Sequence, residues 1–418
     1  MLRSRGLLPW LATLVVAAAP AYLLRFSVAG IPTTGLEILI YFFVAAVVVT
    51  QWGRFRPVPR RIIWPVVLFL LAAIISTVIA PDKREALGIL KGWIIDPLLF
   101  VWALWQIPDR EKTTRALMTG LLSGGLFVAL VAVYQRITGQ VTFDGRVIGP
   151  YAWSAAENAS PNYLALYLAP LAVLSSGLAA EALLARRWPR GTFLAVAFAL
   201  MTLAIFLSFS RGGLAALVVG IAAKDTLRFW PWIRRRAIIK AALVIIAITA
   251  VVGAGYYIQP NPLLSPEEGG RITASNNVRW EIWRTTVREV IPASPLLGVG
   301  LGNFQPYFTE LTQGRVNYDR IAPLALTPHN LFLALWVNLG LLGLVAVLWL
   351  LVDVFRRMWR QAQSWTVAAL VGALVALAAH GLLDTPYFKN DLSLLFWTLI
   401  ALLVMWSQDR RENQRVKS

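Results

Sequence analysis

One arginine lies at a short break between two apolar runs. Arg211 lies in the segment FLSFSRGG, a short polar break that would place its guanidinium at the edge of a membrane if the flanking runs cross one. A cation in that position is costly unless it has a partner, and guanidinium binds phosphate oxygens in a bidentate manner. Anion binding is therefore one interpretation of Arg211, and a side chain that reaches toward lipid phosphates is the alternative.

A histidine precedes another apolar run. His329 lies in TPHNLFLALW, where Pro328 fixes the entry into the run. Neutral imidazole can accept a proton from a sugar hydroxyl or donate one to a phosphate oxygen. A histidine at a helix start is more often a cap, but this one is expected to face the same compartment as Arg211 and Arg279. We therefore treat His329 as a candidate base.

The second of the two histidines is His380, in the segment HGLLD with Asp384. A spacing of four places both residues on one helix face, so the sequence predicts a structural pair. The chain has no Cys and no third His, so we expect no metal site, no disulfide and no cysteine nucleophile.

A helix is predicted from Asn276 and Asn277, which are plausible N-caps, to about Ile291, before Pro292 and Pro295. Its apolar residues fall on one stripe, so we expect it to lie along the bilayer surface. Arg279 flanks one edge of the stripe, Arg284 and Arg288 flank the other, and the stripe itself comprises Trp280, Trp283, Val287, Val290 and Ile291. The next segment, SPLLGVGLGNF at 294–304, comes after a helix rather than a strand, which argues against a dinucleotide loop. Its glycines favour a sharp, close-packed turn beside substrate.

The whole chain must reside in a membrane. Of its 418 residues 58% are hydrophobic and 14% charged, which leaves more apolar surface than a water-soluble protein can bury. We therefore predict an all-α polytopic protein of about twelve spans, one domain over 1–418. The spans are predicted at 7–24, 35–50, 62–80, 92–106, 116–134, 161–184, 192–207, 212–223, 238–258, 330–352, 366–383 and 392–406.

Positive charge gives the orientation. Most of the 39 Lys and Arg residues fall in the short segments on one side of these spans, so the positive-inside rule predicts cytoplasmic N- and C-termini. The net charge of +18 then faces anionic lipid headgroups, and no nucleic-acid partner is expected. One long external loop remains, residues 259–329, which contains the predicted amphipathic helix.

Three stretches together resemble the O-antigen ligase and O-antigen polymerase family, the WaaL-like or Wzy_C superfamily. They are FLSFSRGGLAALVVG (206–220), NNVRWEIWRTTVREVIPASPLLGVGLGNF (276–304) and TPHNLFLALWVNLGLLGLVAVLWLL (327–351). Two shorter segments, 160–171 and 380–390, are similar to weaker family positions.

The resemblance implies a GT-C-like, metal-independent, inverting glycosyltransferase without a cofactor. Its donor would be a glycan on a polyprenyl diphosphate, and its acceptor a lipid or glycan at the external face of the bacterial inner membrane. On this reading Arg211 and Arg279 contact the diphosphate, and His329 acts on the acceptor or the diphosphate. Arg284, Arg288 and Asn330 are further substrate-binding candidates.

Three functions remain open. The first is a ligase that attaches a finished glycan to an acceptor such as the lipid A core in lipopolysaccharide biosynthesis. The second is a polymerase that joins repeat units, and the third is a transporter of the lipid-linked glycan. The external acids Glu281, Glu289, Glu310 and Asp319 suggest no carboxylate pair of the kind that glycoside hydrolases use.

Overall fold

The computed structural model describes residues 4–153, 160–233, 278–316, 318–359, 361 and 363–415 of the chain. Almost all regular structure in this part of the chain is helical, as the sequence predicts. Among the described residues, six helical segments are long and apolar enough to cross a membrane, and four shorter apolar helices accompany them. The protein is therefore a multi-pass membrane protein. The predicted span 238–258 lies outside the described residues.

The first half of the chain contains the elements α1 (Ser4–Ala17), η1 (Ala19–Leu23), β1 (Arg25–Val28), β2 (Ile31–Thr34), α2 (Gly35–Gln51), α3 (Arg60–Ile79), α4 (Lys83–Ile89), η2 (Leu90–Ile95), α5 (Asp96–Gln106), α6 (Arg110–Thr138), η3 (Gly149–Trp153) and α7 (Pro161–Leu184). The second half contains α8 (Trp188–Leu207), α9 (Arg211–Ile233), η4 (Thr286–Val290), α12 (Ile291–Ala293), α13 (Phe304–Thr312), α14 (Tyr318–Ile321), η5 (Ala322–Leu324), α15 (Leu331–Trp359), α16 (Trp365–His380) and α17 (Asn390–Arg415).

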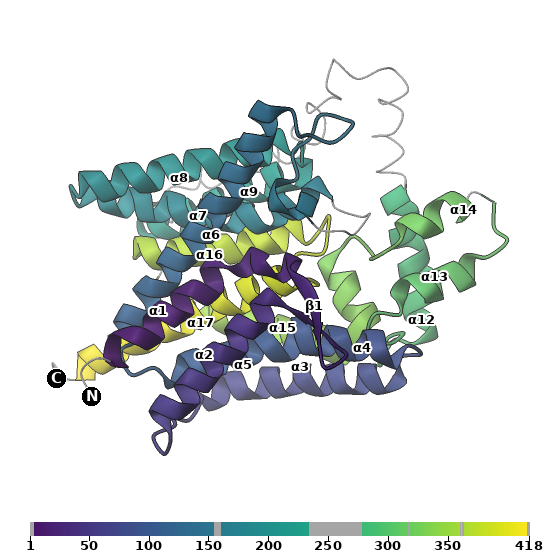
Figure 1. Ribbon diagram of the computed structural model, residues 1–418, viewed down its shortest axis with the longest axis horizontal. Coiled ribbons are helices and arrows are strands. Elements are labelled where there is room, and N and C mark those ends of the chain that lie inside the picture. Colours follow the sequence, from purple (N-terminus) through teal and green to yellow (C-terminus); the bar gives the residue numbers. More distant parts are fainter. Residues whose placement is uncertain are drawn as a thin grey trace.

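The long helices form one bundle. α7 lies at the centre of one half, packed against α8, α9 and α16, while α15 packs on α3 and α1 packs on α6 in the other. The lobe, which we define as residues 278–325, projects at the opposite end from the start of α1 and the end of α17 (Figure 1). Its own apolar core includes Ile282, Val290, Phe304 and Phe308.

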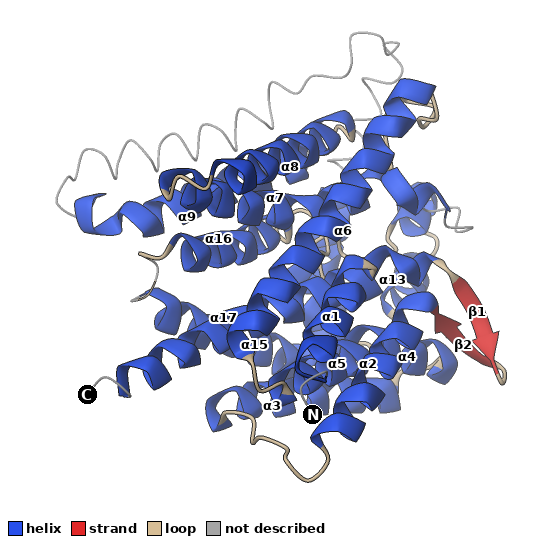
Figure 2. Cartoon of the chain, turned by 60° about the vertical axis from the view of Figure 1, so that its left-hand side comes forward, coloured by secondary structure: helices blue, strands red, loops and turns tan. Residues whose placement is uncertain are grey.

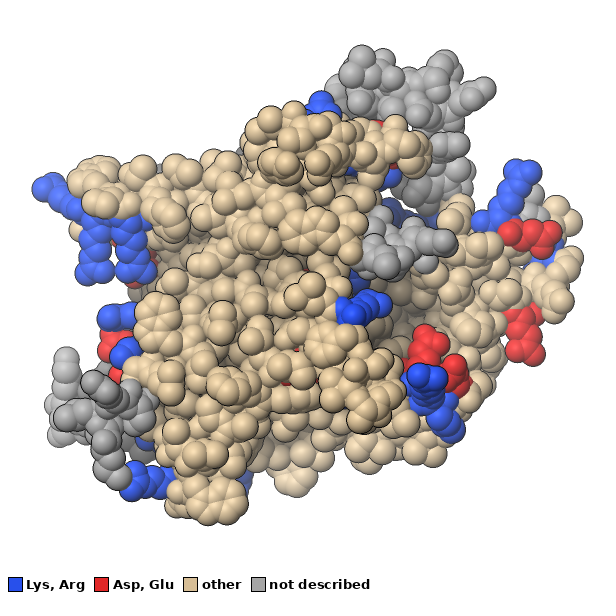
Figure 3. Space-filling model, viewed as in Figure 1, with Lys and Arg blue, Asp and Glu red and all other residues tan. Residues whose placement is uncertain are grey.

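Charge is distributed as a membrane environment requires. On the face drawn in Figure 3, most Lys, Arg, Asp and Glu side chains gather at the two ends of the molecule, and a broad uncharged surface separates them. Burying a charge in hydrocarbon costs several kcal/mol, so this uncharged surface is the part suited to lipid.

A β-hairpin comes after α1, although the sequence pattern predicted only helix there. The first helix ends at Ala17 rather than near residue 24, and β1 pairs antiparallel with β2 (Figure 2). Ala29 and Gly30 at the turn both have positive φ, 50° and 79°, which is the signature of a two-residue type I′ turn.

The Gly-rich segment forms the close-packed turn that its composition predicts. Gly298 has a φ of 75°, and Val299 N donates to Val337 O of α15 at 2.8 Å. Gly340, at a kink inside α15, has a φ of 66°, and a Cβ there would overlap the carbonyl oxygen of Leu296. The turn thus fixes the lobe to the kinked helix. Its nearness to substrate stays a prediction.

The predicted single stripe of the amphipathic helix is wrong. Residues 278–285 are helical, but η4 is a π-helical turn, which adds a residue to the turn and rotates the later residues about the helix axis. Val290 and Ile291 are buried in the lobe core, whereas Trp280 and Val287 are 62% and 51% exposed. The helix also continues through Pro292 to the end of α12.

Candidate functional site

The carboxylate of Asp384 brings two of the predicted site residues together. His329 Nδ1 lies 3.6 Å from its Oδ1, and Arg279 Nη2 lies 3.9 Å from its Oδ2. Asn162 Nδ2 donates to Oδ2 at 3.2 Å, and the backbone N–H of Thr385 donates to Oδ1 at 2.9 Å. We call Asp384, Arg279, His329 and Arg211 the polar centre.

The predicted His380–Asp384 pair on one helix is wrong. α16 ends at His380, so Asp384 lies in the loop 381–389, and its backbone N–H closes the last turn on His380 O at 3.0 Å. The side chain then turns toward Arg279, His329 and Asn162.

Backbone geometry sets the direction of His329. Its φ of 46° lies in the left-handed region, which costs a non-glycine residue about 1 kcal/mol or more and is often found at functional sites. The backbone N–H donates to Thr327 Oγ1 at 3.3 Å, and ring atom Nε2 lies 3.3 Å from Leu324 O. The imidazole is therefore held between a carbonyl and a carboxylate, with about a quarter of the side chain exposed.

Arg279 comes from the helix 278–285. Trp283, one turn later, donates its Nε1–H to Pro328 O at 2.8 Å, which ties this helix to the residue before His329. The sequence-distant guanidinium and imidazole are thus positioned by one direct contact between their own segments.

Arg211 begins α9, just before the predicted span 212–223. Ser210 caps the helix, because its Oγ accepts from Gly213 N at 3.2 Å. A Cβ on Gly212 would lie 3.0 Å from His380 Nε2, so only a small residue fits between α9 and that ring. Burial and the positive charge of Arg279 both lower the pKa of Arg211, so the two guanidiniums are close enough to repel each other. Within the described residues Arg211 forms no ion pair.

The polar centre carries more positive than negative charge. Burial alone would raise the pKa of Asp384, but His329, Arg279 and His380 together lower it to about 2. One carboxylate is thus fully charged at neutral pH and faces Arg279 and the His329 imidazole, while Arg211 lies near Arg279. An excess of cations around a partly exposed space is suited to an anion such as a diphosphate.

The other predicted substrate-binding residues lie at the margin of the polar centre or have other partners. Arg284 is half exposed and lies 3.6 Å from Glu281, and Arg288 is exposed. Asn330 caps α15, since its Oδ1 accepts from Phe332 N and Leu333 N, while its Nδ2 donates to Leu382 O. This gives Asn330 a positioning role and leaves its direct contact with substrate a prediction.

A half-buried lysine lies beside the polar centre and was not among the residues predicted from the sequence. Lys389 Nζ lies 3.1 Å from the ring centroid of Tyr163, the residue after Asn162, and 5.4 Å from that of Tyr151. Burial lowers the pKa of Lys389 to about 8, although Asp391 raises it. The run DTPYFKND, in which two acids and a lysine cluster at a span end, was the signal that could have pointed to it.

No group of three or more His, Asp or Glu side chains within the described ranges is placed to hold a metal ion. Metal independence stays a prediction, as does the absence of a cofactor.

The fold and this polar centre define a multi-pass helical membrane protein with a cationic site at one end of its bundle. A family model described as O-antigen ligase matches residues 196–348. This match confirms, for those residues, the family resemblance predicted from the sequence. It includes Arg211, Arg279 and His329 but neither Asn162 nor Asp384. No curated protein matches the chain. The family supports a glycosyltransferase-like role in surface polysaccharide biosynthesis with a lipid-linked glycan as substrate.

Proposed function

We propose that this protein is a membrane glycosyltransferase of the O-antigen ligase type. It transfers glycan from a polyprenyl diphosphate to a hydroxyl of a lipid or glycan acceptor at the external face of the bacterial inner membrane. The observation that carries the proposal is the grouping of Arg279 and His329 around Asp384, with Arg211 close enough to Arg279 for repulsion.

The arginines act on the leaving group. When the bond between the anomeric carbon and the diphosphate oxygen breaks, negative charge grows on that oxygen. Arg211 and Arg279 donate charge-assisted hydrogen bonds to the diphosphate and stabilise this charge, which is the task that a divalent cation performs in other enzymes. The mutual repulsion of the two guanidiniums is relieved when the anion is bound.

His329 acts on the acceptor. Its Nε2 contact with Leu324 O is long, at 3.3 Å, so an acceptor hydroxyl can replace this carbonyl when the ring proton is on Nδ1, toward Asp384, and Nε2 is free to accept. The imidazole takes the hydroxyl proton while the oxygen attacks the anomeric carbon from the face opposite the diphosphate, with inversion. Asp384 faces Nδ1 and stabilises the positive charge that the ring gains, as a carboxylate does behind a catalytic histidine.

Reconstitution tests the proposal. Purified protein in vesicles receives a polyprenyl-diphosphate glycan and candidate acceptors in the absence of divalent metal, and transfer is measured. We expect Arg211→Ala, Arg279→Ala and His329→Ala to abolish transfer while the protein stays folded. Arg320→Ala, at an exposed position of the lobe, is the matched control that keeps activity. Normal transfer by all three site variants would contradict the proposal.

A cellular experiment separates ligase from polymerase. Loss of a ligase leaves long glycan chains unattached, whereas loss of a polymerase leaves single repeats on the acceptor. Our proposal is the ligase, with the polymerase as the alternative within the same chemistry and a transporter as the less favoured third.

We also propose twelve spans, a GT-C-like arrangement, cytoplasmic termini and an external loop at 259–329. The absence of Cys makes this simple to test, because a single introduced cysteine is the sole thiol. A membrane-impermeant thiol reagent applied from outside should label a cysteine at the exposed Leu296 and leave one at the exposed Trp52 unlabelled. The reverse pattern would contradict the orientation.

A further inference from the structure

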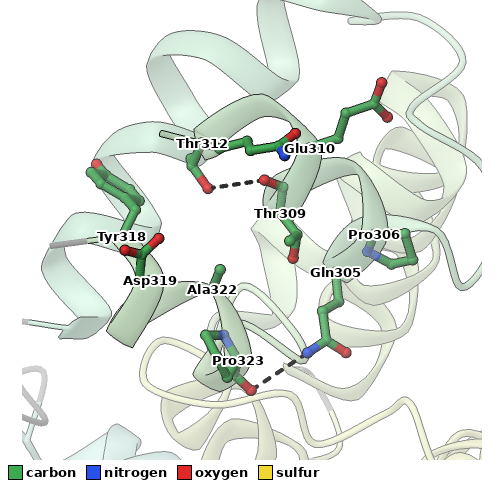
Figure 4. A pocket seen from close by; sticks show the side chains of 10 residues that line it. Gln305, Pro306, Thr309, Glu310, Thr312, Tyr318, Asp319, Ala322 and Pro323 are labelled. Carbon is green, nitrogen blue, oxygen red and sulfur yellow. Dashed lines mark hydrogen bonds between the residues drawn. The ribbon is translucent and has the colours of Figure 1, made fainter. Parts of the chain in front are cut away.

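The lobe contains an open pocket of about 700 Å³ that is separate from the polar centre. It lies between α13 on one side and α14 with η5 on the other. Figure 4 shows Gln305, Thr309 and Thr312 across from Asp319 and Pro323. Glu310, Gln313, Tyr318, Pro306 and Ala322 complete the lining.

The lining is suited to sugar hydroxyls. Amides both donate and accept hydrogen bonds, carboxylates accept them, and the Tyr318 ring with the Pro323 ring supplies apolar surface for sugar C–H groups. In the whole chain, Lys and Arg outnumber Asp and Glu by 39 to 21. The lining of this pocket contains two acids, Glu310 and Asp319, and no Lys or Arg. This charge pattern favours a neutral or amine-bearing sugar and disfavours a phosphate or an acidic sugar.

Hydrogen-bonding capacity is available in the pocket. A weak hydrogen bond joins its two sides, from Gln305 Nε2 to Pro323 O at 3.4 Å (Figure 4). The side chains of Gln313 and Asp319 are exposed and make no hydrogen bond to other described residues. A sugar can therefore bind there without displacing strong internal bonds.

The segments that line the pocket contact the segments that carry the polar centre. Pro323 lines it, and the next carbonyl along the chain, Leu324 O, contacts the His329 ring at 3.3 Å. On the other side, the Tyr318 hydroxyl lies 2.8 Å from Thr285 Oγ1, at the end of the helix that carries Arg279. A ligand in the pocket would thus be held by the elements that position the candidate catalytic groups.

We propose that this pocket binds neutral or amine-bearing sugar units of a glycan substrate, remote from the bond that is transferred. The inference rests on the proposed glycan transfer for its biological meaning, but the binding itself is a separate property. Two substrates could supply such sugars, the donor glycan and the acceptor glycan, and steady-state kinetics distinguish them.

Direct binding tests the pocket. The full chain in nanodiscs is titrated with three probes of equal length, neutral N-acetylchitotriose, its amine-bearing deacetylated trimer, and anionic trigalacturonate, with ligand-observed NMR as readout. We expect the first two to bind and trigalacturonate to bind at least about tenfold more weakly. Asp319→Asn should weaken the amine-bearing trimer more than the neutral one. Equal binding of all three probes would overturn the inference.

Pocket-filling variants provide the structural control. Thr309→Trp and Gln313→Trp place a large side chain at exposed pocket positions, and Val316→Trp does so at an 85% exposed position of the lobe outside the lining. We expect the first two to lose binding by about tenfold or more and the third to retain it. Unchanged binding in Thr309→Trp and Gln313→Trp would overturn the inference.

Arg211→Ala separates this inference from the proposed function, because it should lose transfer and keep trimer binding. Loss of trimer binding in Arg211→Ala would mean that the sugars bind at the polar centre, against the pocket. In the transfer assay, Thr309→Trp should raise the KM for one substrate only: the donor if its glycan occupies the pocket, or the acceptor if that glycan does. An unchanged KM for both would remove the pocket from glycan recognition even if transfer itself is intact.

Discussion

Two groups of charged side chains in this protein differ in how tightly they are paired. In the lobe, Arg315 grips Glu289 with two parallel bonds of 2.8 and 2.6 Å, and both side chains are more than a third exposed. In the polar centre, the Asp384 side chain is 8% exposed, yet its neighbours His329 and Arg279 lie 3.6 and 3.9 Å away. The exposed ion pair therefore has short contacts, whereas the buried carboxylate has longer contacts with its neighbours.

Physical chemistry predicts the opposite for purely structural ion pairs. A buried charge is costly unless its partners are close and well aligned, whereas an exposed charge is already solvated by water. The loose spacing and the excess of cations at the polar centre leave hydrogen-bonding capacity that a ligand oxygen can use. The lobe pair therefore satisfies its own charges, whereas the polar centre is the site at which we propose that an anion binds.

The largest expected effect separates the two arginines. Arg279→Gln removes a cation from the polar centre and should lower the rate of glycan transfer at least about a thousandfold, the scale at which an arginine stabilises a departing phosphate. Arg315→Gln makes the same chemical change in the lobe and should leave the rate within about twofold of wild type. Transfer rates in reconstituted vesicles measure both.

Equal losses in the two variants would contradict this contrast between the lobe and the polar centre. So would a normal rate in Arg279→Gln. Circular dichroism and detergent-solubilised size profiles of both proteins ensure that the difference in rate does not come from unfolding.

Asp384 provides the next largest effect. Asp384→Asn keeps the shape of the side chain but removes the charge that faces His329, so we expect transfer to fall on the order of a hundredfold. Asp384→Glu, which restores the charge, should recover part of the rate. A wild-type rate in Asp384→Asn would reduce this residue to a structural role.

The pKa of Asp384 also makes a prediction for stability. Because the folded state lowers this pKa to about 2, the carboxylate stabilises the folded protein above its ordinary pKa near 4, and this contribution is lost as pH falls toward 2. The melting temperature of wild type should therefore fall between pH 4 and pH 2 by more than that of Asp384→Asn. Parallel curves would contradict the assignment.

The sequence alone could predict most helices but not the polar centre around Asp384. Long apolar runs must be helical in a membrane, and Arg211 and His329 stand out because they interrupt or flank such runs. Arg279 lies within the long loop and stands out through the family resemblance of its helix. The contact of Asp384 with Asn162 joins residues 222 positions apart, which no local pattern encodes. The end of α16 at His380 decides where Asp384 points, and helix ends are the least certain part of any such prediction.

The π-helical turn and the hairpin were missed for related reasons. A period of 3.6 residues assumes a regular helix, and the turn at Thr286–Val290 breaks that period without a proline or glycine to announce it. The Ala29–Gly30 turn is a weaker hairpin signal than Asn-Gly, and the flanking strands are four residues each.

Lys389, a half-buried residue beside the polar centre, should have a smaller effect, on the pH dependence of stability. Burial lowers its pKa to about 8 in the folded protein, from an ordinary value near 10.5, so the folded state binds fewer protons than the unfolded state between these values. The contribution of Lys389 to stability should therefore rise with pH over this window, by about 3 °C in melting temperature between pH 8 and pH 10 relative to a variant without the amine.

Lys389→Met is the control for this rise, since it keeps the length of the side chain without the amine. Its melting temperature should lack the increase. Burial raises the pKa of Tyr22 and of Tyr151, so these tyrosines lower stability as pH approaches their ordinary value near 10, but they do so in both proteins, and the difference between the two curves isolates Lys389. The same increase in the variant would assign it to another group.

The smallest expected effect concerns the exposed pair of Arg315 and Glu289. The Arg315 hydrogen bonds hold the pKa of Glu289 below its ordinary value, so the pair stabilises the folded protein at neutral pH and loses that contribution as pH falls through the range in which the carboxyl is protonated. Because both side chains are largely solvated, Glu289→Gln should lower the melting temperature at pH 7 by at most about 2 °C, and salt at about 1 M should reduce that difference further. Asp384→Asn measured in the same salt should keep its full effect, since mobile ions do not reach a buried carboxylate. If salt abolished both effects equally, the contrast between the exposed Arg315–Glu289 pair and the buried carboxylate of the polar centre would not hold.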